Sequence, residues 1–198
     1  MGYDFLAELK RVGALKEGHF VLASGRHSHQ YVEKFDLLRD PVATQRACEE
    51  LIRRLGDLAD VDLVAGPTTG GILLAFEIAR QLGLPAAYAE RVAEGSSERA
   101  FKRGTVIEPG TRVLAVDDIL TTGGSVRATL DALAAVGAEV VAVAVLVDRS
   151  AGTVDFGCPL VSLAKLEIDT WEPDEVPDWL AAIPVTKPGT TATPATAG

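Results

Sequence analysis

Residues 113–125 read Val113-Leu114-Ala115-Val116-Asp117-Asp118-Ile119-Leu120-Thr121-Thr122-Gly123-Gly124-Ser125. The apolar residues at the beginning have the length of a buried strand, and the small residues at the end form a turn into a helix. The amides of that turn, together with the free N–H groups that open the helix, form a concavity for an anion. The segment therefore predicts a phosphate site at the carboxyl end of a parallel strand.

Two acids, Asp117 and Asp118, stand at the end of the predicted strand. Neighbouring carboxylates can accept hydrogen bonds from the vicinal hydroxyls of a sugar, and a sugar beside a phosphate site suits a ribose 5-phosphate. Gly123 and Gly124 let the backbone approach the phosphate closely, while Thr121, Thr122 and Ser125 add hydroxyl donors. The alternative is that the acids and the turn only cap a helix, but the complete pattern favours a ligand site.

From residue 61 onward, apolar runs of strand length alternate with helical segments. The predicted strands are 61–65, 86–90, 112–116 and 140–147, and the predicted helices between them are 71–82 and 125–136. This alternation indicates an α/β fold with a doubly wound, mostly parallel sheet flanked by helices. Ligands bind such sheets beyond the carboxyl ends of the strands. The chemistry is expected at residues 66–71, 91–104, 117–125 and 148–152.

The ends of the chain read differently from this core. We expect a helix at 3–12, two short strands within 18–34, a helix from about 41 to 58, a strand at 160–166 and a short helix at 172–182. The loop between the two short strands should carry Arg26, His27, Ser28 and His29. Asp40 and Pro41 have the residue types that cap and open a helix. We predict one domain over 1–185 and a disordered tail at 186–198. Within the domain, a small N-terminal part at about 1–40, here called the hood, precedes a core at about 41–170.

Composition narrows the functional classes. The chain has 198 residues and a net charge of −9, so its field repels polyanions and a nucleic-acid partner is not expected. Cys48 and Cys158 lie far apart without the spacing of a zinc site or a disulfide framework. The longest apolar run, 140–147, is too short to span a bilayer. We expect a cytoplasmic protein with small-molecule substrates, reduced thiols and no membrane partner.

Segment 113–125 resembles the ribose-phosphate signature of type I phosphoribosyltransferases. This resemblance implies the fold of that family and the donor 5-phosphoribosyl 1-diphosphate, with Asp117 and Asp118 on the ribose hydroxyls and Thr121 to Ser125 on the 5-phosphate. It also implies a diphosphate loop after the first core strand, where Gly66-Pro67-Thr68-Thr69-Gly70-Gly71 stands. The diphosphate candidates are Thr68, Thr69, Gly70 and Gly71. The alternative is a tight turn without a ligand.

Two further segments resemble the orotate phosphoribosyltransferases. Residues 17–28 look like the N-terminal hood of that family, and Val147-Asp148-Arg149-Ser150 is similar to its carboxylate-contacting arginine. A guanidinium at the mouth of a parallel sheet can form a two-pronged pair with a planar carboxylate, which orotate carries. The candidates for the base site are Ser24, Gly25, Tyr31 and Arg149. The alternatives are a surface ion pair of Arg149 with Asp148 or Asp155, and ordinary core packing of Tyr31.

The chain departs from the orotate enzymes at three places. Ala23 and Gly70 stand where many members carry lysine, and residues 91–104 lack the Lys-x-x-Lys-x-His arrangement of the catalytic loop. The expected catalytic residues are therefore Asp117, Asp118, Arg91 and Lys102. Arg99 and Arg103 are further cations for the leaving diphosphate. For all four basic residues, a solvated charged hairpin is the alternative.

The resemblance implies phosphoribosyl transfer to orotate, in the synthesis of pyrimidine nucleotides. It implies Mg²⁺ bound through the substrate with no direct protein ligand, and a homodimer. One alternative is a phosphoribosyltransferase for another base. The other is a non-catalytic sensor that binds the donor, because two lysines of the family are missing.

Overall fold

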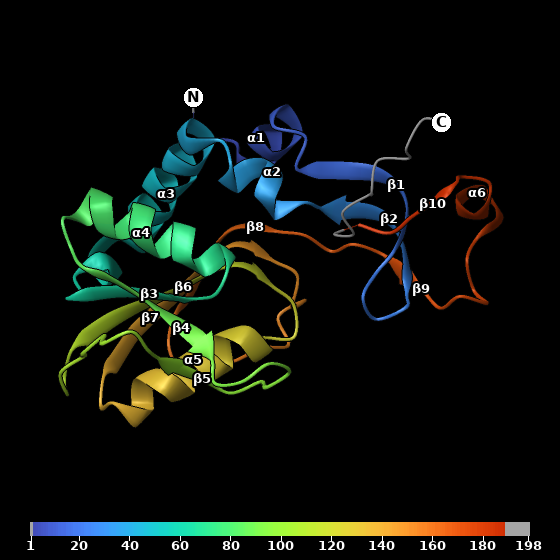
Figure 1. Cartoon of the computed structure of the whole chain (residues 1–198). Helices are drawn as coiled ribbons and strands as arrows, with labels where there is room; N and C mark the ends of the chain where they lie inside the picture. Colours follow the sequence, from blue (N-terminus) through green and yellow to red (C-terminus); the bar gives the residue numbers. More distant parts are fainter. Residues whose placement is uncertain (1, 189–198) are drawn as a thin grey trace, which may run out of the picture.

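The central sheet has six strands in the order β5-β4-β3-β6-β7-β8 in a computed structural model that describes residues 2–188 (Figure 1). The strands pair in parallel, except that the edge strand β5 runs antiparallel to β4. They are β3 (Leu63–Pro67), β4 (Ala86–Arg91), β5 (Arg99–Phe101), β6 (Arg112–Leu120), β7 (Glu139–Asp148) and β8 (Leu160–Lys165). The central strands β3, β6 and β7 are continuously apolar over most of their length because both of their faces are buried.

Helices cover both faces of this sheet. α3 (Pro41–Leu55) and α4 (Gly70–Leu82) pack on one face, and α5 (Gly124–Ala135) packs on the other. Along β6, Leu114 and Val116 face the first layer, while Val113 and Ala115 face the second. Such alternation buries apolar side chains on both sides of a strand. The doubly wound α/β fold predicted from the sequence is confirmed.

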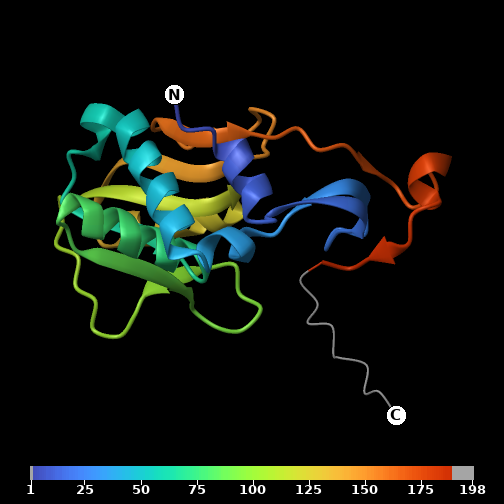
Figure 2. The same cartoon turned by 90° about the horizontal axis from the view of Figure 1, so that it is seen from above.

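A second sheet, the hood, extends from one end of this core (Figure 2). Its strand order is β10-β1-β2-β9, and α6 lies against β1. Its elements are β1 (Leu15–Val21), β2 (His27–Val32), β9 (Thr170–Trp171), α6 (Asp178–Ala181) and β10 (Val185–Thr186). α1 (Phe5–Arg11) precedes the hood and α2 (Lys34–Leu38) joins it to α3. The end of the described chain thus returns to the N-terminal hairpin, and the two are stabilised together.

Several predicted boundaries need correction. β6 runs to Leu120, so Asp117 and Asp118 lie inside the strand and not beyond it, because β6 keeps its pairing with β7 through that point. His27, Ser28 and His29 belong to β2 and not to the loop, since β2 pairs with β1 up to the register of His27 with Val21. The helix expected to reach residue 58 ends at Leu55, where Gly56 takes a positive φ and the 3-10 turn η1 (Gly56–Ala59) follows. α2 and β5 are short elements that the sequence pattern did not indicate.

The C-terminal region also differs from expectation. Of the helix expected at 172–182, only α6 is helical. Thr186, assigned to the tail from its composition, pairs with Phe20 of β1. The remainder of the predicted tail, from 189 onward, lies outside the described residues.

The two cysteines are free thiols, and burial raises the pKa of the Cys48 thiol. Between residues 2 and 188, none of the helices has the length and apolar character needed to cross a membrane.

Candidate functional site

Three neighbouring strands bring the predicted site residues to one edge of the sheet. β3 and β6 are in register at Ala65 and Ala115, so the loop after Pro67 emerges beside Asp117. β6 and β7 are in register at Leu120 and Asp148, so Arg149 follows directly beside the predicted phosphate turn 121–125. Carboxyl ends of adjacent parallel strands meet at the same edge, which is why loops far apart in sequence converge here.

Asp117 and Asp118 are both almost fully buried, at 6% and 3% exposure. Oδ1 of Asp117 accepts the backbone N–H of Asp118 at 2.8 Å, and Oδ1 of Asp118 accepts the N–H of Ile119 at 2.7 Å. Oδ2 of Asp118 is buried and has no hydrogen-bond donor in the described part of the chain. Burial, together with the neighbouring charge of Asp118, raises the pKa of the Asp117 carboxyl to about 7. Oδ2 of Asp118 therefore keeps capacity to accept a hydrogen bond.

The turn after β6 leads directly into α5. Gly123 takes a positive φ of 79° as the N-cap residue of α5, and no side chain caps that end. Added there, a Cβ would stand 3.0 Å from Val154, so glycine suits both the backbone conformation and the space. Thr121, Thr122, Gly124 and Ser125 are exposed around this end. The first N–H groups of α5 thus have no side-chain cap, and their role in binding a phosphate stays a prediction.

The loop Gly66–Gly71 packs tightly against β6. A Cβ on Gly70, the first residue of α4, would stand 1.7 Å from Oδ2 of Asp118. The carboxylate therefore occupies the space that a side chain at residue 70 would fill. Thr68 is half-buried and Thr69 is exposed at this loop. The loop therefore meets the acidic pair at Asp118.

Of the four basic residues in the segment 91–104, Arg99 contacts both the loop Gly66–Gly71 and the start of α5. It is buried, and its guanidinium donates to Oγ1 of Thr68 at 3.1 Å and to Oγ of Ser125 at 3.2 Å. Burial lowers the pKa of Arg99 while the charge of Asp117 acts in the opposite direction. Arg99 thus joins the two predicted phosphate loops.

The other three basic residues bond within or beside the β4–β5 hairpin. Lys102 Nζ donates to the carbonyl oxygens of Arg91 at 2.7 Å and Val92 at 3.2 Å. Arg91 donates to the carbonyl oxygen of Ser96. Arg103 pairs with Glu90 at 3.0 Å. In this conformation the expected catalytic residues Arg91 and Lys102 hold the hairpin, and their role in catalysis stays a prediction.

Lys34, which the sequence pattern did not single out, reaches the acidic pair from α2. Its Nζ lies 2.8 Å from Oδ2 of Asp118. The two atoms are at ion-pair distance, but their angles do not form a hydrogen bond. Nothing in the residues next to Lys34 marks it, and the one available signal was indirect: two buried acids in sequence require a cation from somewhere.

Arg149 follows β7 and lies half-buried at the mouth of the sheet. Its Nε is buried and has no hydrogen-bond partner in the described part of the chain. The alternative of an ion pair with Asp148 or Asp155 is not observed: Asp148 accepts from the N–H and hydroxyl of Ser150, and Asp155 accepts from the N–H of Gly157. Burial lowers the pKa of Arg149. Arg149 borders a cavity of about 240 Å³ between residues 149–151 and 166–169.

Tyr31 lies in β2, whereas Ser24 and Gly25 lie in the turn between β1 and β2. Burial raises the pKa of Tyr31, and the positive charge of Arg149 acts in the opposite direction. The Tyr31 ring also packs on Phe20 at 5.8 Å between centroids. The turn with Ser24 and Gly25 lies at the far end of the hood hairpin from the six-stranded sheet (Figure 2). The charge of Arg149 therefore acts on Tyr31, and a shared role of these residues with Ser24 and Gly25 at a base site stays a prediction.

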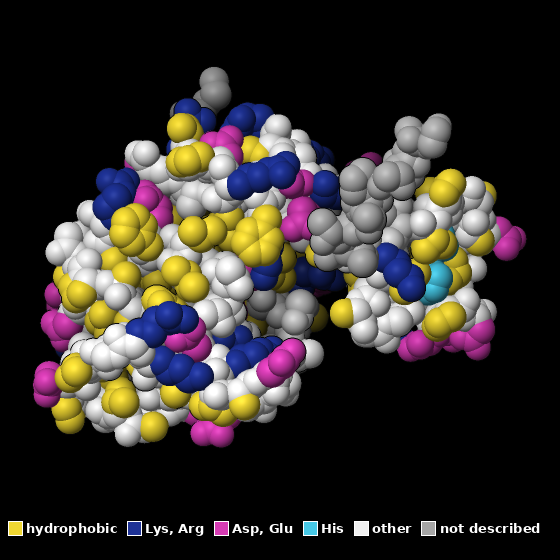
Figure 3. All heavy atoms as spheres, in the orientation of Figure 1, with side chains coloured by type: hydrophobic (Ala, Val, Ile, Leu, Met, Phe, Trp, Pro, Cys, Tyr) yellow, Lys and Arg dark blue, Asp and Glu magenta, His cyan; other side chains and the backbone are white. Residues whose placement is uncertain are grey.

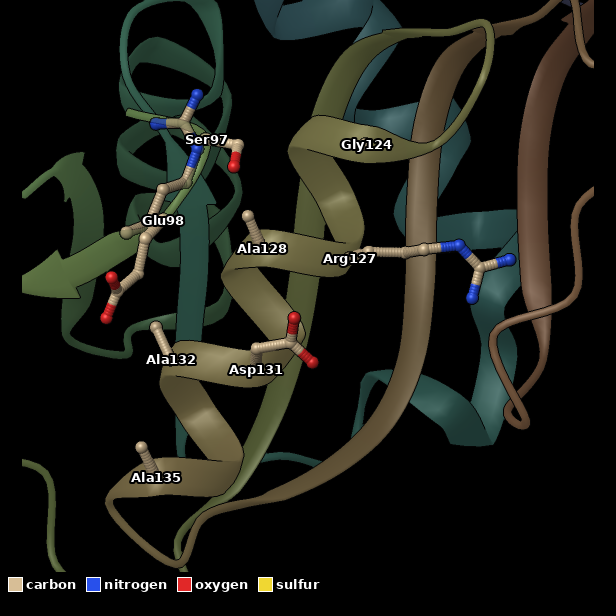
Figure 4. Close-up of a pocket in the computed structure, with 9 residues that line it drawn as sticks. Ser97, Glu98, Gly124, Arg127, Ala128, Asp131, Ala132 and Ala135 are labelled. Atoms are coloured by element: carbon tan, nitrogen blue, oxygen red, sulfur yellow. The ribbon is translucent and has the colours of Figure 1, made fainter. Parts of the chain in front are cut away.

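A larger groove, of about 340 Å³, lies beside α5 (Figure 4). One of its sides is the small-residue surface of α5 with Ala128, Ala132 and Ala135, and the other is the hairpin at Ser97 and Glu98. It meets the phosphate turn only at Gly124 and contains neither the acidic pair nor Arg149. The candidate site is therefore located by its charged side chains, Asp117, Asp118 and Arg149, and not by the volume of the groove.

Comparisons with known proteins show the family to which the chain belongs. The model of the phosphoribosyl transferase domain matches residues 39–175. The orotate phosphoribosyltransferase of Methylobacterium sp. (strain 4-46) is 46% identical over 191 residues, which cover 96% of this chain and 96% of that protein. The chain belongs to the orotate phosphoribosyltransferase family.

Other members of the family are similar over most of their length. The orotate phosphoribosyltransferase of Caulobacter vibrioides (strain NA1000 / CB15N) is 43% identical over 94% of this chain and 95% of that protein. The crystal structure of the Aeropyrum pernix orotate phosphoribosyltransferase superposes with a TM-score of 0.72, at 34% identity, over 83% of this chain and 94% of that chain. The family and the fold expected from the sequence are confirmed.

Proposed function

We propose that this enzyme transfers the 5-phosphoribosyl group of 5-phosphoribosyl 1-diphosphate to orotate, which yields orotidine 5′-phosphate and diphosphate. The observation that carries the proposal is Arg149, whose buried Nε has no partner at the mouth of the sheet. A planar carboxylate satisfies a guanidinium with two parallel hydrogen bonds, and orotate has such a group where plain nucleobases do not. The activity named for its relatives supports the same choice.

The donor would lie across the two glycine-rich loops. The 5-phosphate binds at Thr121, Thr122, Gly123, Gly124 and Ser125, where α5 offers free N–H groups. The ribose hydroxyls donate to Asp117 and Asp118. Of the two carboxylates, Asp118 has an Oδ2 atom without a hydrogen bond. The diphosphate binds over Thr68, Thr69, Gly70 and Gly71. The two loops lie on adjacent strands, which suits a ligand with a phosphate at each end.

Catalysis by this site rests on positioning and on charge. The C1–O bond to diphosphate breaks as the bond from C1 to the ring nitrogen forms, so the sugar becomes cationic while the leaving group gains negative charge. Arg99 supplies a fixed guanidinium between Thr68 and Ser125 for that charge. The carboxylates of Asp117 and Asp118 lie on the ribose side, where positive charge develops. Arg149 holds the carboxylate of the acceptor and Tyr31 lies against its ring.

Magnesium fits this site as an ion that the donor carries. Within residues 2–188, no cluster of three or more His, Cys, Asp or Glu side chains could hold a metal on its own. Mg²⁺ accepts substrate phosphate oxygens with one or two carboxylates and retains several waters. Asp117 and Asp118 would hold it through the ribose hydroxyls or through water. When bound, the ion supplies positive charge for the leaving diphosphate.

A homodimer is the proposed assembly. Phe35 of α2, Val42 at the start of α3, and Leu73 and Phe76 of α4 are all exposed, Phe76 at 63%. The three helices contact one another, and hydrophobic side chains gather over them in the space-filling view (Figure 3). Such a patch on a water-soluble enzyme suits a second copy of the chain. Sedimentation velocity of wild type and Phe76→Asp tests it: a monomeric wild type would contradict the proposal.

A cytoplasmic location is proposed as well. It is supported by the two unpaired thiols, since disulfides are rare in reducing compartments. Cell fractionation that found the protein outside the cytoplasm would contradict it.

The test of the activity is a spectrophotometric assay with donor and magnesium and one base at a time. Orotate should be consumed, while uracil and hypoxanthine should not. Turnover of uracil or hypoxanthine in place of orotate would assign a different base. Donor binding without turnover of any base would identify a sensor.

A further inference from the structure

The proposed donor site contains few cations of its own. The diphosphate loop Gly66–Gly71 and the phosphate turn 121–125 have no basic side chain, and between them lie the buried acids Asp117 and Asp118. A donor with three phosphate groups would meet a local surplus of negative charge, which Coulomb repulsion makes unfavourable. The guanidinium of Arg99 offsets part of that negative charge near Thr68 and Ser125. Besides the magnesium that the donor carries, a cation of the protein on the side of Gly70 and Asp118 would offset the remaining negative charge.

The structure assigns this cation to Lys34 of α2: we propose that its ammonium binds the diphosphate of the donor and thereby completes the loop at Gly70. This inference rests on the proposed function and deepens its donor site. Lys34 Nζ lies 2.8 Å from Oδ2 of Asp118. A Cβ on Gly70 would meet that same oxygen at 1.7 Å. The ammonium is therefore held next to the N-terminal end of α4 by an atom that touches both.

The geometry allows the ammonium to exchange partners. The Lys34 side chain is 36% exposed, whereas the Asp118 side chain is 4% exposed, so the lysine reaches the carboxylate from the solvent side. No hydrogen bond fixes the pair. When a ribose hydroxyl donates to Asp118, the ammonium can turn by a short distance to a diphosphate oxygen on the same side. In the free enzyme, Lys34 offsets the charge of the buried acid.

Two neighbouring cations, Lys16 and Arg39, are not placed to bind the diphosphate beside Asp118. Lys16 of β1 lies 2.7 Å from Asp36 of α2, and Arg39 lies 2.6 Å from the same residue. Both are thus occupied on α2, away from Asp118. Lys16 is a matched control for Lys34, because it is a partly exposed lysine in an ion pair of similar length with the same helix.

The experiment measures calorimetric affinities with magnesium for three probes: the donor, inorganic diphosphate and ribose 5-phosphate. In Lys34→Met, affinity for the donor and for diphosphate should fall by about tenfold to a hundredfold, the value of a charge-assisted contact. Affinity for ribose 5-phosphate, which lacks the diphosphate, should stay within about threefold of wild type. Lys34→Arg should restore part of the loss because the charge is kept, and Lys16→Met should match wild type.

Two results would overturn the inference. Donor affinity in Lys34→Met within threefold of wild type would show that the ammonium does not bind the donor. An equal loss for ribose 5-phosphate and for the donor would show that Lys34 acts only by positioning Asp118. Neither measurement involves a base, so failure of the orotate assay would leave this inference standing, and its own failure would leave the proposed activity standing.

Discussion

Two buried polar atoms at the candidate site lack the hydrogen bonds that buried atoms normally have. They are Oδ2 of Asp118 and Nε of Arg149, and they lie at the carboxyl ends of the adjacent strands β6 and β7. An unsatisfied buried polar group costs about 1–3 kcal/mol, a cost that the ion pair with Lys34 reduces at Asp118 and that nothing in the described residues offsets at Nε of Arg149. A ligand with hydroxyls at one end and a carboxylate at the other would satisfy both.

The Arg149→Ala variant should lose orotate turnover without losing the donor. A buried charged pair broken on one side costs about 3–5 kcal/mol, so kcat/KM for orotate should fall by roughly two to three and a half orders of magnitude. Donor affinity should be nearly unchanged because the phosphate turn belongs to β6. Arg149→Lys should rescue only part, since an ammonium lacks the planar fork.

The measurements are kcat/KM for orotate and the Kd of the donor in the three proteins. Near-wild-type turnover in Arg149→Ala would remove the support that Arg149 gives to orotate. A parallel fall of turnover and donor affinity would contradict a specific role in binding the base.

The Asp117→Asn variant should bind the donor worse and yet fold more stably at neutral pH. Burial raises the folded-state pKa of Asp117 to about 7. Between its unfolded value near 4 and that value, the folded state binds more protons than the unfolded state, so wild-type stability falls as pH rises. Asparagine does not titrate and avoids this loss.

Urea titrations at pH 5 and pH 8 give the free energy of unfolding and so test whether wild-type stability falls as pH rises. The advantage of Asp117→Asn over wild type should be larger at pH 8, by more than about 1.4 kcal/mol, the equivalent of one pKa unit. Its donor affinity should be at least about tenfold weaker. An advantage that stays constant with pH would contradict the raised pKa.

At the scale of elements, the start of α4 is fitted to β6. Gly70, the first residue of α4, has no side chain, and the Asp118 carboxylate occupies the space beside it. Lys34 of α2 lies 2.8 Å from Oδ2 of that carboxylate. Three elements therefore meet at one carboxylate. A lysine at residue 70 would have to displace that carboxylate in this chain.

The Gly70→Ala variant should disturb the site through Asp118. The new Cβ would stand 1.7 Å from Oδ2, and overpacking of this kind costs about 1–3 kcal/mol. We expect lower stability and a donor affinity reduced by tenfold or more. In the double variant Gly70→Ala/Asp118→Ala, stability should recover relative to Gly70→Ala, whereas donor affinity should not.

Thermal unfolding and donor titration of wild type, Gly70→Ala and the double variant measure this. If the double variant is no more stable than Gly70→Ala, the clash is not with Asp118.

At the scale of the molecule, the site lies where the core meets the hood. The space-filling view is hollowed between the two, with Lys and Arg side chains along the hollow (Figure 3). The hood depends on both ends of the described chain: β10 pairs with β1, and His19 contacts the carbonyl oxygen of Ile183 at 3.2 Å. The C-terminal segment is therefore part of the hood and not only an appendage.

Two truncations separate the paired residues from those beyond them. A chain that ends at Pro188 should keep wild-type activity and melting temperature, because residues 189–198 have no side chain larger than threonine or proline with which to form a core. A chain that ends at Pro184 lacks β10 and should melt at a lower temperature, since the edge of β1 loses its partner. Equal melting of the two truncated chains would contradict a role for β10.

The sequence alone was sufficient for features that depend on residues close together in the chain. The strand-to-helix turn at 121–125, the capping of α3 by Asp40 and the position of Arg149 after β7 all follow from local backbone preferences and hydrophobic periodicity. The parallel arrangement of the core followed as well, because buried strands alternating with helices have few ways to pack. These predictions concern which residues lie at the mouth of the sheet.

Tertiary structure was needed to decide which charges meet there. Arg99 and Lys34 reach the site, while Arg91 and Lys102 bond to the backbone of their own hairpin. Lys34 and Asp118 are 84 positions apart, and no local pattern links them. Their contact depends on how α2 packs against α4 and on the empty side-chain position at Gly70. Long, flexible basic side chains can reach several partners, so the electrostatics of this site are fixed by packing between distant elements and not by sequence spacing.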